Sequence, residues 1–382
     1  MKTPAHPLPA GHFPCFPHLL RVPSALALGL ILTASAQAQE KSWLKDWREK
    51  QSNKIPQQYL CHYTATPLQI DGKQDDAAWA TAPWTEYFQD IEGDAKPKPT
   101  FKTHAKMLWD EQYLYIAASL EEPHVWATVT KRDEVIFVDP DFEVFIDPDG
   151  DSHQYYEFEM NALNTGWDLF MERPYKDNCG ARNEWNIAGL KTAVNIRGTI
   201  NNAADKDEGW DVEIAIPWKA LGEYANRPSP PQEGDQWRAG FSRVHWLFDI
   251  IDGKYVKKPK TPEHNWIWSP QGVIDMHRPE TWAYVQFTRL APGAVSFSPD
   301  PSAVVRYALQ EVYYAQMDHR QKTGSWSLDF KELGVTPPAG DAWKDWKLEK
   351  TDAGYQCSVN WQSPKGVQRW AIQHDSRVGL LK

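Results

Sequence analysis

The chain has 382 residues, of which 41% are hydrophobic and 24% are charged. These fractions are typical of globular proteins and exclude both a wholly disordered chain and a protein with many membrane spans. The 51 acidic residues outnumber the 41 Lys and Arg residues, and the resulting formal net charge of -10 argues against a nucleic-acid partner. With 29 Pro and 20 Trp residues, the composition favours a loop-rich β protein.

Residues 1–38 have the features of a secretory signal peptide. Lys2 and Arg21 precede a short apolar run at 25–33, the segment has no acidic residue, and Ala36-Gln-Ala38 is a small-x-small cleavage site. The apolar run is too short for a typical membrane span. We therefore expect an exported protein, periplasmic or extracellular, with no membrane span after cleavage. An uncleaved anchor helix is the alternative.

The next segments predict a short tether and then a β domain. Residues 39–56 are polar, with Trp43, Leu44 and Trp47 at helical spacing. From 57 to 289, short runs of alternating apolar residues are separated by Gly, Pro, Asp and Asn, which is typical of an all-β, antiparallel β-sandwich. The predicted strands are 106–109, 113–118, 142–146, 155–160, 167–171, 210–216, 237–246 and 281–287. Helices are expected only near 75–80 and 218–221.

The last part of the chain predicts a small α+β appendage. Residues 290–302 contain several prolines and are interpreted as a linker. Apolar residues on one side of 303–322 predict a helix. Three short strands are expected near 346–349, 355–361 and 368–374, so the appendage spans 303–382.

Alternation along 141–147 and 155–161 separates an apolar face from a polar one. If the two strands pair as a hairpin, Glu143, Glu159 and Asn161 lie on one face together with aromatic rings. An ordinary solvated face and a polar binding surface both fit this pattern. Carboxylate and amide groups bind sugar hydroxyls, and aromatic rings pack against sugar C–H faces, so the mixture suits a carbohydrate ligand.

Several ordered segments resemble the family 9 carbohydrate-binding modules, which occur on xylanases and as stand-alone exported proteins. Two of them are Asp141-Phe-Glu-Val-Phe-Ile-Asp147 and Gly209-Trp-Asp-Val-Glu-Ile-Ala-Ile-Pro217. The other matching segments are 68–79, 107–116 and 265–270. The resemblance covers about 57–288 and implies a β-sandwich that binds an oligosaccharide or polysaccharide during carbohydrate breakdown.

The resemblance also implies which residues bind the sugar. Family members hold a sugar end between two aromatic rings, which correspond here to Phe137, where the family has Trp, and to Trp268. Where the family has Arg-x-Asn this chain has Glu159-Met-Asn161, and this reverses a charge in the pocket. The predicted carbohydrate-binding residues are Phe137, Glu143, Glu159, Asn161, Arg243 and Trp268, with Arg243 as the candidate to restore a cation.

A structural calcium ion is a further implication of the resemblance. The segment Asp147-Pro-Asp-Gly-Asp151 offers the carboxylates of Asp147, Asp149 and Asp151, and calcium prefers oxygen ligands. A tight polar turn explains the same residues without a metal, and it is the favoured interpretation. No other cofactor is expected.

Two other functions compete with sugar binding. Glu143 with Glu157 or Glu159 would supply the carboxyl pair of a glycoside hydrolase, although the 90 or so residues after the sandwich are too few for a typical hydrolase domain. Related sandwiches bind haem, for which the candidate ligands are Met160, Met171, Met276, His245 and His277. A methionine in a strand more often packs in the hydrophobic core than binds haem iron. No catalytic residue is assigned.

Overall fold

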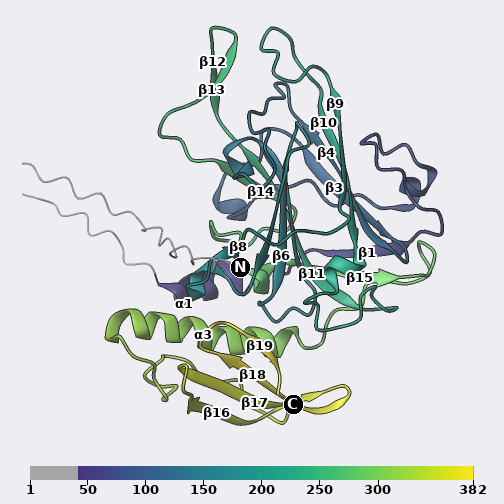
Figure 1. Ribbon diagram of the computed structural model, residues 1–382. Helices are drawn as coiled ribbons and strands as arrows, with labels where there is room; N and C mark the ends of the chain where they lie inside the picture. Colours follow the sequence, from purple (N-terminus) through teal and green to yellow (C-terminus); the bar gives the residue numbers. More distant parts are fainter. Residues whose placement is uncertain (1–41, 382) are drawn as a thin grey trace, which may run out of the picture. The chain divides into compact units, whose positions relative to one another are not determined.

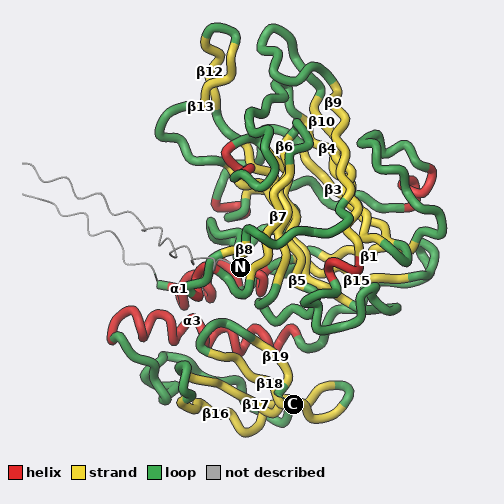
Figure 2. The backbone as a smooth tube through the Cα atoms, viewed as in Figure 1, coloured by secondary structure: helices red, strands yellow, loops and turns green. Residues whose placement is uncertain are grey.

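The computed structural model describes residues 42–381, so the predicted leader, residues 1–38, lies outside the described residues. Strands and loops make up most of this part of the chain, and helices are few (Figure 2). No helix within residues 42–381 is long and apolar enough to cross a membrane.

Thirteen strands form one large sheet with two arms (Figure 1). The first arm contains, in spatial order, β8 (Ala181–Arg182), β7 (Gly166–Met171), β6 (Tyr155–Asn161), β5 (Asp141–Asp147) and β11 (Gln236–His245). The second arm contains β15 (Ala283–Thr288), β1 (Gln58–Tyr63), β3 (Thr103–Trp109), β4 (Tyr113–Glu121), β10 (Gly209–Pro217) and β9 (Lys191–Arg197). Two short strands extend the sheet from β11, namely β14 (His264–Ile267) and β2 (Gln89–Asp90).

One hydrophobic cluster lies between the two arms. It contains Phe142 of β5 and Phe158 of β6 from the first arm, and Ile116 of β4 and Ile214 of β10 from the second, each at most 1% exposed. The two arms therefore pack face to face, which confirms the predicted sandwich-like β fold.

Strand β1 departs from the predicted antiparallel arrangement. It runs parallel to both of its neighbours, β15 and β3. Parallel neighbours need a long crossover rather than a hairpin, and the long segment 64–102 joins β1 to β3. The other paired strands are antiparallel, as predicted.

The predicted strands between 106 and 287 all overlap observed strands. The alternation does not predict β9 or the separate hairpin of β12 (Phe248–Ile251) and β13 (Lys254–Lys257), whose residues are only partly buried or exposed. The predicted helix at 218–221 is confirmed as α2 (Trp218–Leu221). The helix predicted near 75–80 is a 3-10 turn over Ala77–Thr81.

The end of the chain forms a helix and a second sheet. Helix α3 (Ala303–Thr323) ends at Gly324, which adopts the left-handed conformation at φ 76° that glycine favours in a C-cap. The four antiparallel strands are β16 (Trp343–Lys350), β17 (Tyr355–Ser363), β18 (Gly366–Gln373) and β19 (Val378–Leu380). The helix and the first three strands were expected, whereas the short β19 has no clear sequence signal.

Residues from both ends of the described chain share a second hydrophobic cluster. It contains Leu309 and Val312 of α3, Val359 of β17, and also Trp47. Trp47 begins a π-helical turn, Trp47–Gln51, directly after α1 (Trp43–Asp46). The N-terminal segment therefore contributes a buried ring to this cluster.

Candidate functional site

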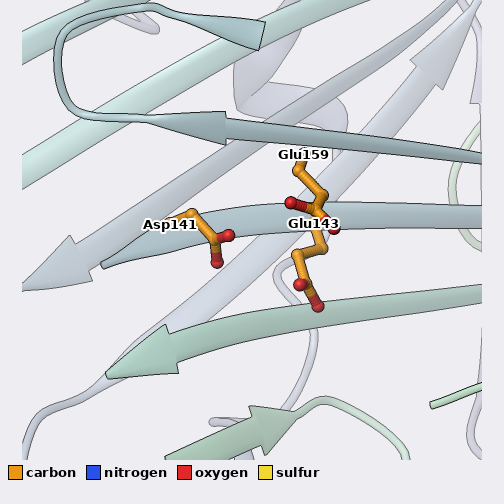
Figure 3. A group of neighbouring side chains, drawn as sticks. All are labelled: Asp141, Glu143 and Glu159. Atoms are coloured by element: carbon orange, nitrogen blue, oxygen red, sulfur yellow. The ribbon is translucent and has the colours of Figure 1, made fainter. Parts of the chain in front are cut away.

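Acidic side chains from two neighbouring strands meet on the face of the first arm that points away from the main core. The register pairs Glu143 of β5 directly with Glu159 of β6, and Asp141 with Asn161. Residues paired in this way have side chains on the same face and close together. Figure 3 shows the carboxylates of Asp141, Glu143 and Glu159 near one another, and one oxygen from each lies within 4.8 Å of the others.

These carboxylates are buried. Glu143 is 5% exposed and Glu159 is 2% exposed, because loops cover this face of the sheet. Burial raises the pKa of Glu143 to about 7; the Ser242 hydroxyl opposes the rise and the Glu263 carboxylate adds to it. Burial, with repulsion by Glu143, also holds the pKa of Asp141 and Glu159 well above the usual range.

Several oxygens of this group have no hydrogen-bond donor. They are Oδ2 of Asp141, Oε2 of Glu143 and Oε2 of Glu157. Burial and repulsion by Glu143 raise the pKa of Glu157 as well. A buried polar atom without a partner costs free energy, so these oxygens are suited to accept hydrogen bonds from a ligand.

A cavity of about 440 Å³ opens over Glu143, Glu157 and Glu159, whereas Asp141 does not line it. This volume lies in the range of small-molecule sites. Its acidic lining residues are Glu143, Glu157, Glu159, Glu263 and Asp275. Its ring-bearing lining residues are Phe137, Phe145, Trp167, Tyr175 and His277. None of the residues that line the cavity is Lys or Arg.

The rings reach the cavity from different elements. Trp167 of β7 pairs in register with Glu159, so the indole lies beside that carboxylate on the same face. The indole Nε1 is buried and has no acceptor. Phe137 lies in the 3-10 turn Ile136–Val138, and its backbone N–H donates to Glu159 Oε2 at 3.0 Å.

Two exposed rings lie at the rim of the cavity, and a buried imidazole lies beside one of them. Phe137 is 39% exposed and Tyr175 is 45% exposed. The ring of Tyr175 packs edge-on against His277 with centroids 4.4 Å apart. Burial lowers the pKa of His277 to about 4, so this ring is neutral at neutral pH. The site thus combines apolar ring surface with carboxyl groups at its floor.

A protein-family model matches the part of the chain that contains these strands. The model of the family described as "Carbohydrate family 9 binding domain-like" matches residues 70–238, which include β5, β6 and β7. Residues 70–238 are therefore similar to the carbohydrate family 9 binding domain-like family.

Curated relatives match a similar length of the chain. Exoglucanase XynX of Acetivibrio thermocellus is 27% identical over 171 residues, which is 44% of this chain and 13% of the relative. Endo-1,4-beta-xylanase A of Thermotoga neapolitana is 29% identical over 170 residues, 43% of this chain and 13% of the relative. The chain therefore spans about an eighth of the length of these relatives.

Solved structures show weaker likeness. A putative carbohydrate-binding protein from Bacteroides uniformis has a TM-score of 0.46 at 14% identity, covering 61% of this chain and 100% of that chain. A family 9 carbohydrate-binding module from Caldicellulosiruptor kristjanssonii in complex with cellotriose has a TM-score of 0.38 at 14% identity, covering 64% of this chain and 100% of that chain.

The structure brings together three of the six predicted sugar-binding residues. Phe137, Glu143 and Glu159 all line the cavity. Asn161 does not line it. Its side-chain Nδ2 donates to the Val129 carbonyl at 2.8 Å and to Asp139 Oδ2 at 3.0 Å, so Asn161 holds a neighbouring loop in place.

The prediction for Trp268 is wrong. Trp268 is 2% exposed and belongs to the main hydrophobic cluster, where its ring lies 5.3 Å from that of Phe241 and 6.4 Å from that of Tyr59. The Trp268 backbone N–H donates to the Phe241 carbonyl just after β14 ends. This contact directs the indole into the space between the arms, away from the carboxylates.

The prediction for Arg243 is also wrong. Its guanidinium is buried and donates from Nη2 to Glu122 Oε2 at 2.7 Å and from Nη1 to Thr103 Oγ1 at 3.0 Å. Arg243 does not line the cavity. The ion pair with Glu122 explains this, because a buried guanidinium remains with a partner that compensates its charge. The cavity thus lacks the cation that the sequence analysis placed there.

The predicted set of sugar-binding residues omits several residues that line the cavity, although Glu157 and His277 are named above as candidates for other functions. Glu157 and Trp167 had a signal, because strand alternation places both on the same face as Glu159. Tyr175 and His277 lie in loops, where no periodicity gives their direction. Met160 and Met171, named above as candidate haem ligands, are buried in hydrophobic clusters, as expected for core methionines.

The turn after β5 contains the predicted metal ligands. One oxygen each from Asp147, Asp149 and Asp151 lie within 4.8 Å of one another. Both oxygens of Asp147 accept backbone hydrogen bonds, from Gly150 at 2.9 Å and Ser152 at 3.0 Å. Burial and mutual repulsion raise the pKa of Asp149 to about 6. The donors are of the class that calcium prefers, and the hydrogen bonds alone also account for a tight turn.

Proposed function

We propose that this protein binds the end of a saccharide chain in the cavity over Glu143 and Glu159 and takes part in polysaccharide breakdown without being the hydrolase. The single observation that carries the proposal is the cavity itself, which combines exposed rings with buried carboxyl groups. The similarity of residues 70–238 to family 9 supports it.

The chemistry of the lining suits a sugar. The rings of Phe137, Trp167 and Tyr175 offer apolar surface to the C–H faces of a pyranose. The carboxyl groups offer acceptors, and where they are protonated also a donor, to its hydroxyls. The volume of about 440 Å³ limits the ligand to one or two sugar units, so a chain end fits better than the middle of a polymer.

The names of the curated relatives support a role in polysaccharide breakdown. They are an exoglucanase and two endo-1,4-beta-xylanases. The match covers only 13% or less of each relative. We therefore propose the binding role for this chain and not the hydrolytic activity.

Calorimetric titration of the full chain with a panel of oligosaccharides tests the proposal. We expect binding of at least one saccharide, and we expect Tyr175→Ala to weaken it roughly tenfold by removing a ring from the rim. Tyr87→Ala is the matched control, because Tyr87 is 49% exposed, stacks on a histidine ring and does not line the cavity. Absence of binding by every saccharide, or equal effects of the two variants, would contradict the proposal.

Hydrolysis is a second candidate, because one observation favours it. Glu143, with its pKa near 7, is suited to act as a general acid, and a carboxyl group of Glu159 lies beside it. Release of reducing sugar by the purified chain, abolished in Glu143→Gln, would replace the binding role with catalysis. We expect no such release.

We also propose that calcium stabilises the Asp147–Asp151 turn. A divalent ion there would offset the repulsion between three clustered carboxylates. Thermal unfolding in calcium and in chelator tests this: calcium should raise the melting temperature of the wild type but not of Asp149→Asn. Equal melting temperatures of the wild type in the two conditions would indicate a turn held by hydrogen bonds alone.

Export is the remaining part of the proposal. We propose that residues 1–38 direct the chain to the periplasm or the extracellular space and are removed after Ala38. Intact-mass measurement of the protein from the exported fraction tests this. A mass that still includes the leader would contradict cleavage.

A further inference from the structure

We propose that the ligand of the cavity carries a primary ammonium group, as an amino sugar does, and that this group is seated among Asp141, Glu143 and Glu159. The inference rests on the proposed saccharide binding and specifies the class of saccharide. It begins from an imbalance of charge at the floor of the cavity.

The cavity has acidic groups without a matching cation. Its lining includes five carboxylic side chains and no Lys or Arg. Nearby cations have other partners: Arg278 pairs with Asp275 at 2.6 Å, and Lys176 with Glu280 at 3.3 Å. Lys257 lies 3.7 Å from the centroid of the Trp246 ring and interacts electrostatically with Glu263 and Asp141, but it does not line the cavity. His277 is neutral at neutral pH. A ligand with a positive charge would supply the cation that the cavity lining lacks.

The unpartnered oxygens point to the same conclusion. Glu143 and Glu157 are at least 95% buried, and each has an Oε2 atom without a donor. Asp141 adds a third such oxygen, Oδ2. A neutral sugar hydroxyl donates one hydrogen bond and does not favour the ionised form of a buried carboxyl group. An ammonium group donates three hydrogen bonds and carries the opposite charge.

The spacing of the carboxylates fits one nitrogen. When three oxygens each lie about 2.8 Å from a tetrahedral nitrogen, they are about 4.6 Å apart. One oxygen each from Asp141, Glu143 and Glu159 lie within 4.8 Å of one another (Figure 3). A single ammonium group can therefore contact Glu143 and Glu159, which line the cavity, and also come within reach of Asp141, which does not line it.

The rest of the cavity favours a sugar over a bare metal ion. A metal ion would use the oxygens but leave the ring-lined volume of about 440 Å³ without a role. An amino sugar places its ring against Trp167 and Phe137 while its ammonium group reaches the carboxylates. The aromatic walls add a favourable cation–π contribution.

This arrangement predicts that affinity rises with pH. Glu143 faces Glu157 and Glu159 of β6, Asp141 of its own strand, and Glu263, Asp275, His277 and Tyr175 from the covering loops. Apart from His277, which stays neutral above about pH 4, these groups are acidic, and Lys257 of β13 adds a positive charge that interacts with Asp141 and Glu263. Burial raises the pKa values of Asp141, Glu143, Glu157 and Glu159, so these groups tend to be protonated in the empty cavity. Binding of a cation requires ionised carboxylates, so the affinity should increase from about pH 5.5 to about pH 7.5.

Calorimetry on the full chain tests the inference. The probes are a β-1,4-linked glucosamine disaccharide, its N-acetylated counterpart, cellobiose and calcium chloride alone. We expect the glucosamine disaccharide to bind at least about tenfold more tightly than the two neutral sugars. We also expect Glu143→Gln to remove most of this preference.

Two further variants serve as an alternative and as a control for Glu143→Gln. Glu159→Gln should also reduce the preference, and it serves if Glu143→Gln fails to fold by thermal unfolding. Glu213→Gln is the matched control, because Glu213 is a buried glutamate on a strand but bonds to Trp79 Nε1 and Gly72 N–H far from the cavity lining. The ratio of the affinities for the glucosamine disaccharide and for the neutral disaccharides should be the same in Glu213→Gln as in the wild type.

The outcomes separate this inference from the proposed function. Equal affinity for the three disaccharides overturns the amino-sugar inference and leaves saccharide binding intact. No binding of any saccharide overturns both. Tight binding of calcium alone that depends on Glu143, with no preference for the amine, replaces the inference with a metal site. A preference for the amine that persists in both Gln variants overturns the proposed seat of the ammonium group.

Discussion

At the scale of single residues, the unusual feature is a group of carboxyl groups buried next to one another. Burial opposes the charged form of each carboxyl group, and so does repulsion by neighbouring carboxylates. The pKa values of these groups are therefore raised. A stable fold tolerates such a cost when the groups serve a ligand. The free-energy cost of burying ionised carboxyl groups should make the stability of the fold depend on pH.

The stability contribution of Glu143 should depend on pH. The pKa of Glu143 is near 7 in the folded protein and near 4.5 in the unfolded chain, so the folded state holds the proton more tightly. This contribution favours folding below the unfolded pKa and is lost as the pH rises through 7. We expect Glu143→Gln to exceed the wild type in free energy of unfolding by up to about 3 kcal/mol at pH 8 and to match it near pH 4.5.

Urea unfolding of both proteins across this range measures the difference. Taking the difference between the two proteins removes the opposing contribution of His277, whose lowered pKa makes the fold less stable as the pH falls below about 6.5. A variant that is less stable than the wild type at pH 8 would show that the Glu143 carboxylate is compensated in the folded state.

Trp268 leads to a different prediction, because it belongs to the core. Trp268→Ala should reduce the free energy of unfolding by about 3–5 kcal/mol, since it leaves a large cavity between the arms. Trp84→Ala is the matched control, because Trp84 is 40% exposed and should cost much less. Unfolding curves in urea test both, and a fully stable Trp268→Ala with lost sugar binding would return Trp268 to the binding site.

At the scale of elements, the sequence was most informative where one strand follows another through a short turn. Alternation in β5 and β6 and the turn between them predict a hairpin with Glu143 and Glu159 on one face, which the structure confirms, and the observed register pairs these two residues directly. The direction of Trp268 was not predictable, because it lies just beyond the four-residue strand β14. The loops with Tyr175 and His277 carry no periodicity, so their approach to the cavity emerges only from tertiary packing.

The pairing of β4 with β10 depends on Gly209. This residue has φ 140°, and a Cβ atom there would lie 2.0 Å from the Leu120 carbonyl oxygen. We expect Gly209→Ala to lower the free energy of unfolding by several kcal/mol, because the strand must shift or separate. Gly253→Ala, at φ 72° in the β12–β13 turn with no heavy atom within 4 Å, should cost only about 1 kcal/mol. Thermal unfolding of both variants provides the comparison, and equal losses would contradict the steric argument.

At the scale of the whole described chain, buried polar contacts join the loop after β7 of the large sheet to the C-terminal segment. Tyr313 of α3 donates to Asp177 Oδ1 at 2.6 Å, and Ser376 donates to Asp177 Oδ2 at 2.7 Å. The sequence predicted a helix and strands after residue 302, but it gave no indication that they share buried partners with the loop after β7. Contacts between residues so far apart in the chain leave no pattern in the local sequence from which they could be predicted.

These contacts predict that the two parts unfold together. Asp177→Ala leaves the buried hydroxyls of Tyr313 and Ser376 without their acceptor and should reduce the free energy of unfolding by about 3 kcal/mol. Asp352→Ala, at an exposed position, is the control. Scanning calorimetry should show one transition that shifts to a lower temperature in Asp177→Ala. Two transitions, only one of them shifted, would show that the parts unfold independently.

The central claim is that a saccharide occupies the cavity over Glu143 and Glu159. A crystal structure of the chain grown with the saccharide that binds most tightly in solution tests it most directly. We expect electron density for a sugar ring between Phe137 and Trp167, with a polar group of the sugar within hydrogen-bond distance of Glu143. Clear density for the sugar elsewhere on the protein, with this cavity filled only by water, would contradict the account.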